Sequence, residues 1–429
     1  MTARISTDRP DLAQVSLVAP QMSADPFPYF AALVEHAPVL WNERQRAWFV
    51  SGYDDVSAAL RDDRFGSDRV GPYLESQVPA EDRERFTHLF DILGRWVVFL
   101  GPPDHTRLRG LVHRSFTPRR VKTLQSRATD IAARLADSVA ARLATGDTVD
   151  LMADYCVPLP GQMIAEMFGV PVEDGVRLKV WAEELGLFVN GSLGDGQRNE
   201  RVSAAMAEFE GYLLDLIARY RAHPADNILS GLVEANDSDD TLSELELIAT
   251  CTLILDAGYK TIQNAMANAI LVLMQSPADW ERLATDPVVG VAAVEECLRF
   301  LGPGNVIVRR ARSDIELRGE RIAAGSRVYL LTGAANRDPA KFEGPQRFRI
   351  DRRDNQHLMF GQGIHFCLGA SLARMELAAG LTTLVQRVPR FELALDRADL
   401  PWHRVLILHG IEALPVRRIA EPRGATVGQ

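Results

Sequence analysis

The sequence has few cysteines, and none of them are paired in a motif. Its four cysteines, Cys156, Cys251, Cys297 and Cys367, lie far apart without a C-x-x-C pair, which argues against a zinc or disulfide framework. No apolar run reaches the roughly 20 residues needed to span a bilayer, and the polar N-terminus lacks the apolar stretch of a secretory signal. We therefore expect a cytoplasmic protein without membrane contact.

An excess of basic residues is also missing. The net charge is −9, and Lys and Arg are interspersed with Asp and Glu, so we expect no nucleic-acid partner. Residues 113–122 (HRSFTPRRVK) are a local exception, either a solvated helix end or a docking surface for an acidic protein. No linker, repeat or low-complexity run divides the chain, and 47% apolar content suits a large core, so we expect residues 1–429 to form a single domain.

Helical spacing of apolar residues is the main structural signal. It predicts helices over 119–145, 160–168, 173–187, 200–222, 243–275 and 287–300. Short β-rich parts are expected near 38–50, 305–330 and 390–416. The fold class is therefore mainly α with small β-sheets (α+β). The stretch 342–359 has little periodicity and is expected to be a long irregular loop, which is often functional.

One cysteine lies in a glycine-rich stretch, FGQGIHFCLGA at 360–370. A thiolate can be a nucleophile or a metal ligand, but His365, two residues before Cys367, would not face it as a base in a helix. The residues after Cys367 strongly favour a helix, whose N-terminus would favour the thiolate. The glycines leave room for the backbone to approach a flat, bulky object. An axial thiolate ligand to haem iron needs these features, and the alternative is a structural cysteine in a glycine turn.

The spacing of this stretch resembles the signature of the cytochrome P-450 family. The matching positions are Phe360, Gly361, Gly363, His365, Cys367 and Gly369. The resemblance implies the cytochrome P-450 fold, with haem b between the long central helix and the cysteine-loop helix. It implies that Cys367 binds the iron and that Phe360, Gly361, His365 and Gly369 surround the haem. It further implies a monomeric haem-thiolate monooxygenase that uses O2 and electrons from a ferredoxin and its reductase.

Two further motifs, taken alone, are typical of ordinary surface or structural residues. Glu296 and Arg299 can pair at i, i+3, either as a weak surface ion pair or as a buried pair that needs another partner. The resemblance implies a structural network completed by Arg347. His105 and Arg109 lie one helical turn apart after Pro-Pro and would most often form a solvated basic face.

The resemblance gives the basic residues a haem-binding role. It implies that His105, Arg109, Arg309 and His365 bind the haem propionates, because a buried dianion needs compensation. It also implies that the face bearing residues 113–122 receives an acidic ferredoxin.

The segment LDAGYKTIQNA departs from the family pattern. Ala257, Gly258 and Thr261 match the groove that holds dioxygen beside the haem, but Lys260 stands where an acid is usual. In one interpretation Lys260 points outward, which leaves proton delivery to water and Thr261. Alternatively, Asp256 pairs with Lys260 at i, i+4 and either anchors an N–H or cationic substrate or relays protons. In a third interpretation the reaction ends in coupling or ring closure. We favour the second.

The substrate pocket is expected to be mainly apolar with a few polar anchors. By position on the resemblance its residues are Leu253, Asp256, Ala257, Asn305, Ile307, Leu406 and Ile407, although each apolar member could equally be core. Residues 68–98 are expected to be a variable loop over the site, and 181–198 a mobile lid. We expect a small organic substrate from secondary metabolism. The alternatives are a peroxide-driven or coupling enzyme, and a haem-based binding or sensor protein.

Overall fold

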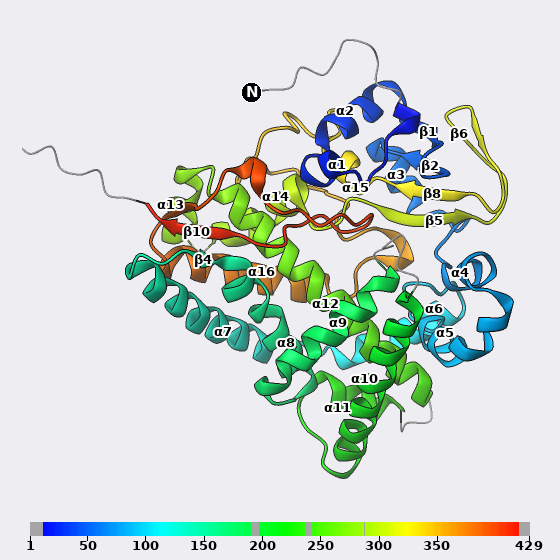
Figure 1. Ribbon diagram of the computed structural model, residues 1–429, viewed down its shortest axis with the longest axis horizontal. Helices are drawn as coiled ribbons and strands as arrows, with labels where there is room; N and C mark the ends of the chain where they lie inside the picture. The colour runs from blue at the N-terminus through cyan, green and yellow to red at the C-terminus, as the bar shows by residue number, and fades with distance from the viewer. Residues whose placement is uncertain (1–11, 190–196, 237–241, 287, 420–429) are drawn as a thin grey trace, which may run out of the picture.

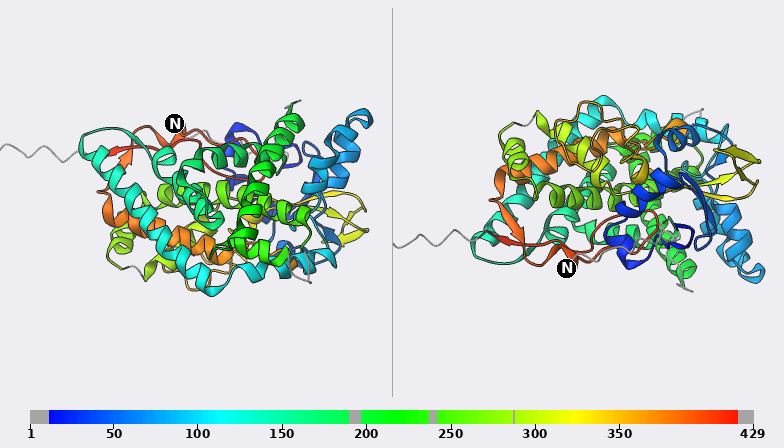
Figure 2. Two further views of the ribbon diagram at one scale, coloured as in Figure 1. Left: turned by 90° about the horizontal axis from the view of Figure 1, so that it is seen from below. Right: turned by 90° about the horizontal axis from the view of Figure 1, so that it is seen from above.

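Helices account for most of the fold. The computed structural model describes residues 12–189, 197–236, 242–286 and 288–419. The helices surround the long helix α12, and a five-stranded sheet lies at one end of the molecule (Figure 1). Both views in Figure 2 show the yellow hairpin that follows the sheet strands projecting from that end. The mainly helical class expected from the sequence is confirmed.

The α-helices of the described chain are as follows. They are α1 (Pro20–Ala24), α2 (Phe27–His36), α3 (Tyr53–Ala59), α4 (Val70–Gln77), α5 (Thr87–Leu93), α6 (Asp104–Ser115), α7 (Pro118–Ala144), α8 (Pro158–Phe168), α9 (Gly175–Val189), α10 (Arg198–Ala222), α11 (Ile228–Asn236), α12 (Glu244–Leu273), α13 (Pro277–Thr285), α14 (Val289–Leu301), α15 (Thr332–Ala335) and α16 (Ala370–Arg387).

The six helices predicted from periodicity are present as α7, α8, α9, α10, α12 and α14. Helix α12 begins where its sequence supplies a capping box: the Ser243 side chain accepts from the Glu246 amide, and the Glu246 carboxylate accepts from the Ser243 amide. None of the described helices is both long and apolar enough to cross a lipid bilayer.

The strands form three small sheets. The largest has the order β1 (Val39–Asn42), β2 (Ala47–Val50), β8 (Arg327–Leu330), β5 (Ile307–Ala311) and β3 (Phe65–Gly66). A second joins β4 (Val149–Asp150), β10 (Pro415–Arg418) and β9 (Phe391–Leu393), and a hairpin joins β6 (Ile315–Leu317) to β7 (Glu320–Ile322). The β-rich parts expected near 38–50 and 305–330 are confirmed.

Two expectations are corrected by the structure. The β-rich part expected near 390–416 is present at its ends as β9 and β10, but the apolar stretch 405–414 forms no strand, only isolated bridges such as Gly304 with Leu408. Its carbonyls are used elsewhere: Ile407 O accepts from the Asn305 amide at 3.1 Å, and His409 O accepts from the Asn268 side chain at 2.9 Å. Residues 68–98, expected to be a loop, contain α4 and α5 because their apolar residues pack into the main core.

Buried hydrogen bonds fix the central helix within the fold. Trp96 Nε1 donates to Thr252 Oγ1 on α12 at 2.9 Å, and both side chains are buried. Across the core, the Tyr155 hydroxyl donates to Gly380 O on α16 at 2.7 Å. The stretch 342–359 has no helix or strand, as expected. It leads directly to the glycine-rich stretch and α16. The Trp96–Thr252 and Tyr155–Gly380 hydrogen bonds therefore hold α12 and the helix that follows the cysteine loop.

Candidate active site

The cysteine loop folds as its glycines require. Gly361 and Gly363 have φ of 66° and 69°, the left-handed region that other residues adopt only at a cost. A Cβ on Gly363 would lie 2.7 Å from Leu60 O, so this glycine also allows close backbone contact. The Cys367 amide donates to Phe360 O at 2.9 Å, which closes the loop. Gly369 is the N-cap of α16, and Cys367 therefore lies just before that helix, as predicted.

The thiol of Cys367 is less acidic than its helix position led us to expect. Burial raises its pKa above the usual value, and this outweighs the Gly369 amide, Arg109 and Arg374, each of which lowers it. The Gly369 amide at the start of α16 lowers the thiol pKa, as expected, but burial raises the pKa by more. A metal cation is the partner that would favour the thiolate form at this buried position.

Basic side chains gather beside the cysteine loop. The rings of His105 and His365 lie 4.6 Å apart, edge to face. Arg109 Nη2 donates to Phe366 O at 2.6 Å. Burial, together with repulsion from Arg309, His105 and Arg109, lowers the pKa of His365 to about 3. The structure therefore brings together all four residues expected to bind the propionates.

This cluster is suited to an anion. Arg309 is only 8% exposed, and burial followed by repulsion from Arg69 lowers its pKa to about 10. Burial and Arg109 likewise lower the pKa of His105. Positive groups whose charge is disfavoured in this way gain from a bound negative group. The two carboxylates of a haem would supply that charge, so the residues fit the group.

The central helix presents its polar residues in two directions. The Thr261 hydroxyl donates to Ala257 O, one turn earlier on α12. Lys260 Nζ instead reaches α9, where it donates to Glu183 O at 3.3 Å. Gly258 has space beside it, since a Cβ there would contact only Ile164 Cδ1, at 3.7 Å. The alanine and glycine thus leave α12 without bulk beside Thr261.

The expected ion pair between Asp256 and Lys260 is not formed within the described part of the chain. The Lys260 ammonium group donates a hydrogen bond to the Glu183 carbonyl, and its effect on Asp256 is electrostatic only. Burial raises the pKa of the Asp256 carboxyl to about 7, although Lys260 and Arg69 each lower it. Our expectation of a paired acid was therefore wrong, because the longer side chain of Lys260 finds a carbonyl on the neighbouring helix.

The predicted pocket residues do not all lie in one place. Asn305 and Ile407 are joined by the main-chain hydrogen bond described above, and Asn305 and Leu406 line one small cavity near His403. Ile307 reaches the cysteine loop, with its Cδ1 3.8 Å from a Cβ placed on Gly361. Leu253 packs against the main core. Residues 190–196 of the expected lid lie outside the described residues, whereas the part before them forms α9.

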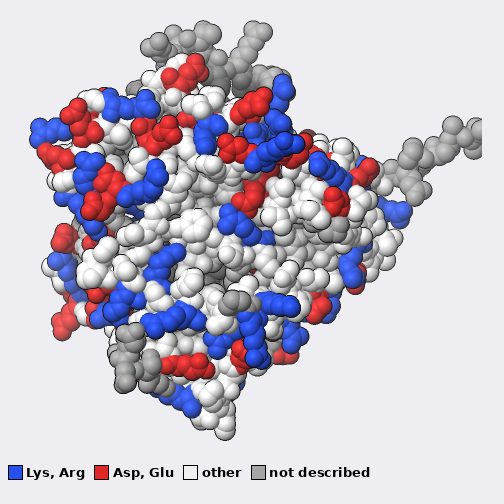
Figure 3. All heavy atoms as spheres, turned by 180° about the vertical axis from the view of Figure 1, so that it is seen from behind, with Lys and Arg blue, Asp and Glu red and all other residues white. Residues whose placement is uncertain are grey.

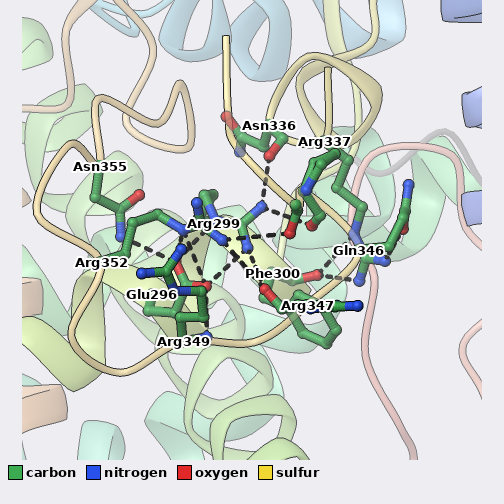
Figure 4. A network of polar contacts seen from close by, with 12 residues as sticks. Glu296, Arg299, Phe300, Asn336, Arg337, Gln346, Arg347, Arg349, Arg352 and Asn355 are labelled. Atoms are coloured by element: carbon green, nitrogen blue, oxygen red, sulfur yellow. Dashed lines mark hydrogen bonds and ion pairs between the residues drawn. The ribbon is translucent and has the colours of Figure 1, made fainter. Parts of the chain in front are cut away.

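The Glu296 carboxylate and the Arg299 guanidinium form a buried pair. Arg299 Nη2 lies 2.7 Å from Glu296 Oε1, and both side chains are fully buried. The third arginine of this network is Arg352, whose Nε lies 3.0 Å from Glu296 Oε2. Arg347, which we expected in this role, takes part through its main-chain carbonyl, which accepts from Arg299 at 3.2 Å (Figure 4). The loop turns after Arg347 and brings Arg352 inward instead.

Comparisons with known proteins agree with this site. The family model described as Cytochrome P450 matches residues 289–404. The chain is 39% identical to the mycinamicin IV hydroxylase/epoxidase of Micromonospora griseorubida, over 87% of this chain and 89% of that protein. It is 34% identical to the polyketide biosynthesis cytochrome P450 PksS of Bacillus subtilis, over 91% and 95%.

The chain belongs to the cytochrome P450 family. The fold agrees, since the structure of P450BioI in complex with an acylated acyl carrier protein superposes with a TM-score of 0.83 at 31% identity. That match covers 93% of this chain and 99% of the other. This P450 is therefore a monooxygenase with haem b as its cofactor.

Two side chains of this P450 site escaped the sequence analysis. Arg352 follows Arg347 in a stretch with four arginines, and spacing alone did not show which one turns inward. Arg69 lies in the segment expected to be a loop. It is close enough to act electrostatically on both Asp256 and Arg309. No motif marks it, and its burial depends on α9 packing over it.

Proposed function

We propose that Cys367 binds the haem iron, while His105, Arg109, Arg309 and His365 hold the propionates. Haem bound through a thiolate supplies an electron-rich iron that promotes cleavage of dioxygen. The observation that carries the proposal is the basic cluster beside the cysteine loop, in which burial disfavours each positive charge. Phe360, Gly361 and Gly369 shape the loop around the thiolate, and Ala257 and Gly258 leave room on the opposite side.

The proposed proton route uses Thr261 rather than Lys260. The Thr261 hydroxyl can hold a water at the groove, whereas Lys260 is bound to α9 and while charged has only donors. If Lys260 lies outside the route, Lys260→Met will leave the fraction of reducing equivalents lost as peroxide unchanged, while Thr261→Ala will raise it. A similar increase in both variants would place Lys260 within the route.

The electron donor we propose is a ferredoxin reduced by its own reductase. His113, Arg114, Arg119 and Lys122 are exposed on α6 and α7, and Arg109 of α6 reaches the residue next to Cys367. On the face seen from behind, Lys and Arg dominate a band across the lower middle (Figure 3). An acidic one-electron carrier suits such a surface because opposite charges steer association.

The proposed substrate is a small organic molecule of secondary metabolism. The named relatives support this, because they act in mycinamicin and polyketide biosynthesis. P450BioI was solved in complex with an acyl carrier protein ligated to hexadec-9Z-enoic acid, which supports a carrier-bound molecule as a second candidate substrate. We further propose that the enzyme acts as a monomer in the cytoplasm.

Turnover assays separate this proposal from its alternatives. The purified enzyme should consume NADPH and O2 with a ferredoxin and reductase, in a substrate-dependent way, and should be much slower with peroxide alone. Equal turnover with peroxide alone would favour a peroxide-driven enzyme. A product without inserted oxygen would favour coupling, and stable ligand binding without any consumption of reductant would favour a sensor.

The ferredoxin surface has its own test. Arg114→Glu with Lys122→Glu should raise the KM for ferredoxin by about tenfold or more, with a smaller effect at high salt. Arg321→Glu, an exposed change on the β6–β7 hairpin, serves as the control and should have no effect. An unchanged KM in the double variant would show that the donor docks elsewhere.

A further inference from the structure

Two partly buried cations end on carbonyl groups of one helix, α9. Lys260 Nζ donates to Glu183 O at 3.3 Å, and Arg69 Nη2 donates to Val189 O, at the last residue of α9, at 3.0 Å. The Val189 carbonyl lies at the C-terminus of the helix, where carbonyls lack an intrahelical partner and carry partial negative charge, so it attracts a cation. Both side chains are therefore directed toward acceptors on α9.

The carboxyl of Asp256 lies within the field of these cations but is bonded to neither. Asp256 is 8% exposed, and no described residue donates a hydrogen bond to it. Buried polar groups are almost always hydrogen-bonded, because the loss of water is costly otherwise. A carboxyl that is buried and accepts no hydrogen bond from the protein points to a donor on a bound molecule.

Asp256 is also placed beside the reaction site. It directly precedes Ala257 and Gly258, which line the groove on α12, and it lies one turn after Leu253 and Thr252. With the haem bound as proposed, this part of α12 would border the space beside it. This placement depends on the proposed function, because the space is a substrate site only when the haem is bound.

The charges around Asp256 narrow the class of molecule. The nearby carboxylates of Glu183 and Glu184 are already paired with Lys179 and Arg201. A cationic group would therefore meet the charges of Lys260 and Arg69 against the one carboxyl of Asp256. A carboxylate would be repelled by Asp256 itself. A neutral donor avoids both penalties and supplies the missing hydrogen bond. We propose that Asp256 is a specificity-determining residue that accepts a hydrogen bond from a hydroxyl group of an uncharged, otherwise apolar substrate.

Spectral titration with matched probes tests this proposal. The holoenzyme is titrated with myristyl alcohol, its methyl ether, myristate and the corresponding trimethylammonium salt, and the change in iron spin state gives each dissociation constant. The alcohol should bind about tenfold more tightly than the ether, the gain expected from one hydrogen bond to a charged group. Both charged probes should bind more weakly than the alcohol.

Two variants assign the effect to Asp256. In Asp256→Leu the alcohol should bind no better than the ether, and in Asp256→Asn the preference should be reduced. Equal binding of alcohol and ether to the wild type, or a preference that survives in Asp256→Leu, would overturn the proposal. If the trimethylammonium salt or myristate bound more tightly than the alcohol, the proposal would also be overturned. The carbon monoxide spectrum of each variant checks haem loading separately, so a failure of the haem-thiolate assignment is recognised by itself.

The pH dependence of alcohol binding gives a second readout. A hydroxyl donor binds the ionised carboxyl better, so affinity should rise as the pH increases through about 7, the pKa to which burial raises Asp256. The other charged groups nearby are Lys260 on α12, Arg69 before α4, and Glu183 and Glu184 on α9. Asp256→Asn should abolish this rise, and a rise that persists in that variant would assign it to another group.

Discussion

The Arg352 guanidinium lies 3.0 Å from the Glu296 carboxylate. The family motif predicts Arg347 in this position. Glu296 also accepts from Arg299, from the Asn355 side chain and from the Arg349 amide. The carboxylate is fully buried, so these donors replace the water that it has lost. The network joins α14 to the loop that leads to the cysteine, and it therefore supports the site from outside the pocket.

Removing one arginine should distinguish the two candidates for this network. Arg352→Leu should lower the free energy of unfolding by about 3 kcal/mol, because it leaves part of a buried carboxylate uncompensated. Arg347→Ala should change it by less than about 0.5 kcal/mol, since the main-chain carbonyl that accepts from Arg299 remains. Urea denaturation of both variants measures the difference. A larger loss in Arg347→Ala would contradict the network as described.

Lys260 should hold α9 in place over the site. Lys260→Met removes the hydrogen bond to Glu183 O, so the amides of the second half of α9 should exchange hydrogen about tenfold faster. Lys179→Met is a matched control, because Lys179 pairs with the Glu183 carboxylate from the exposed side at 3.7 Å. Such exposed pairs contribute about 0–1 kcal/mol, so little change is expected there. Similar exchange in both variants would show that the hydrogen bond from Lys260 does not restrain α9.

The two left-handed glycines of the cysteine loop should differ in their tolerance of alanine. Gly361→Ala should cost about 1–2 kcal/mol for the left-handed backbone alone, since its nearest neighbours are 3.8 Å from the new Cβ. Gly363→Ala should cost more, because its Cβ would meet Leu60 O at 2.7 Å. Gly211→Ala, in the open middle of α10, should stabilise the protein by about 0.5–1 kcal/mol. Thermal unfolding of the three variants would test this order, and equal effects at 361 and 363 would contradict it.

Glu295 should make stability depend on pH in the acid range. Burial would raise its pKa, but the contact with His357 at 3.3 Å and the hydrogen bonds from Arg374 outweigh this and lower it to about 2 from its ordinary 4.5. A lowered pKa contributes stability above about pH 4.5 that is lost as the pH falls toward 2. The contribution is about 1–2 kcal/mol, less than the full shift implies, because Glu295 is partly exposed and solvent screens its partners.

The comparison of Glu295→Gln with the wild type isolates this contribution. Unfolding free energies measured between pH 6 and pH 3 should fall less steeply in the variant. The exposed change Glu281→Gln should follow the wild type. Parallel pH profiles for wild type and Glu295→Gln would show that the carboxylate is not stabilised by its partners. Arg374 also lies over the Phe360 ring, at 4.3 Å, so this group of residues borders the cysteine loop.

The sequence was most informative where one local rule decides the structure. The long helices follow from apolar periodicity, and the start of α12 follows from its Ser243–Glu246 capping box. The left-handed turns at Gly361 and Gly363 follow from the absence of a Cβ. Each of these features depends on residues that are close together in the chain.

The features that the sequence could not predict depend on tertiary partners. The stretch 405–414 is apolar like a strand, yet its carbonyls bond to Asn305 and Asn268, which are distant in the chain. The choice of Arg352 over Arg347 depends on how an irregular loop turns. Lys260 and Asp256 have the right spacing to pair, but a carbonyl of α9 competes for the ammonium group. Spacing within one element shows which residues can meet, not which partner is preferred.

The most direct test of the account is the carbon monoxide spectrum of the purified, reduced protein and of its Cys367→Ser variant. If Cys367 binds the haem iron as a thiolate, the wild type will show the red-shifted Soret band of a thiolate-ligated haem, and the variant will lose that band. A wild-type spectrum without the shifted band, or a variant spectrum that retains it, would contradict the assignment of Cys367.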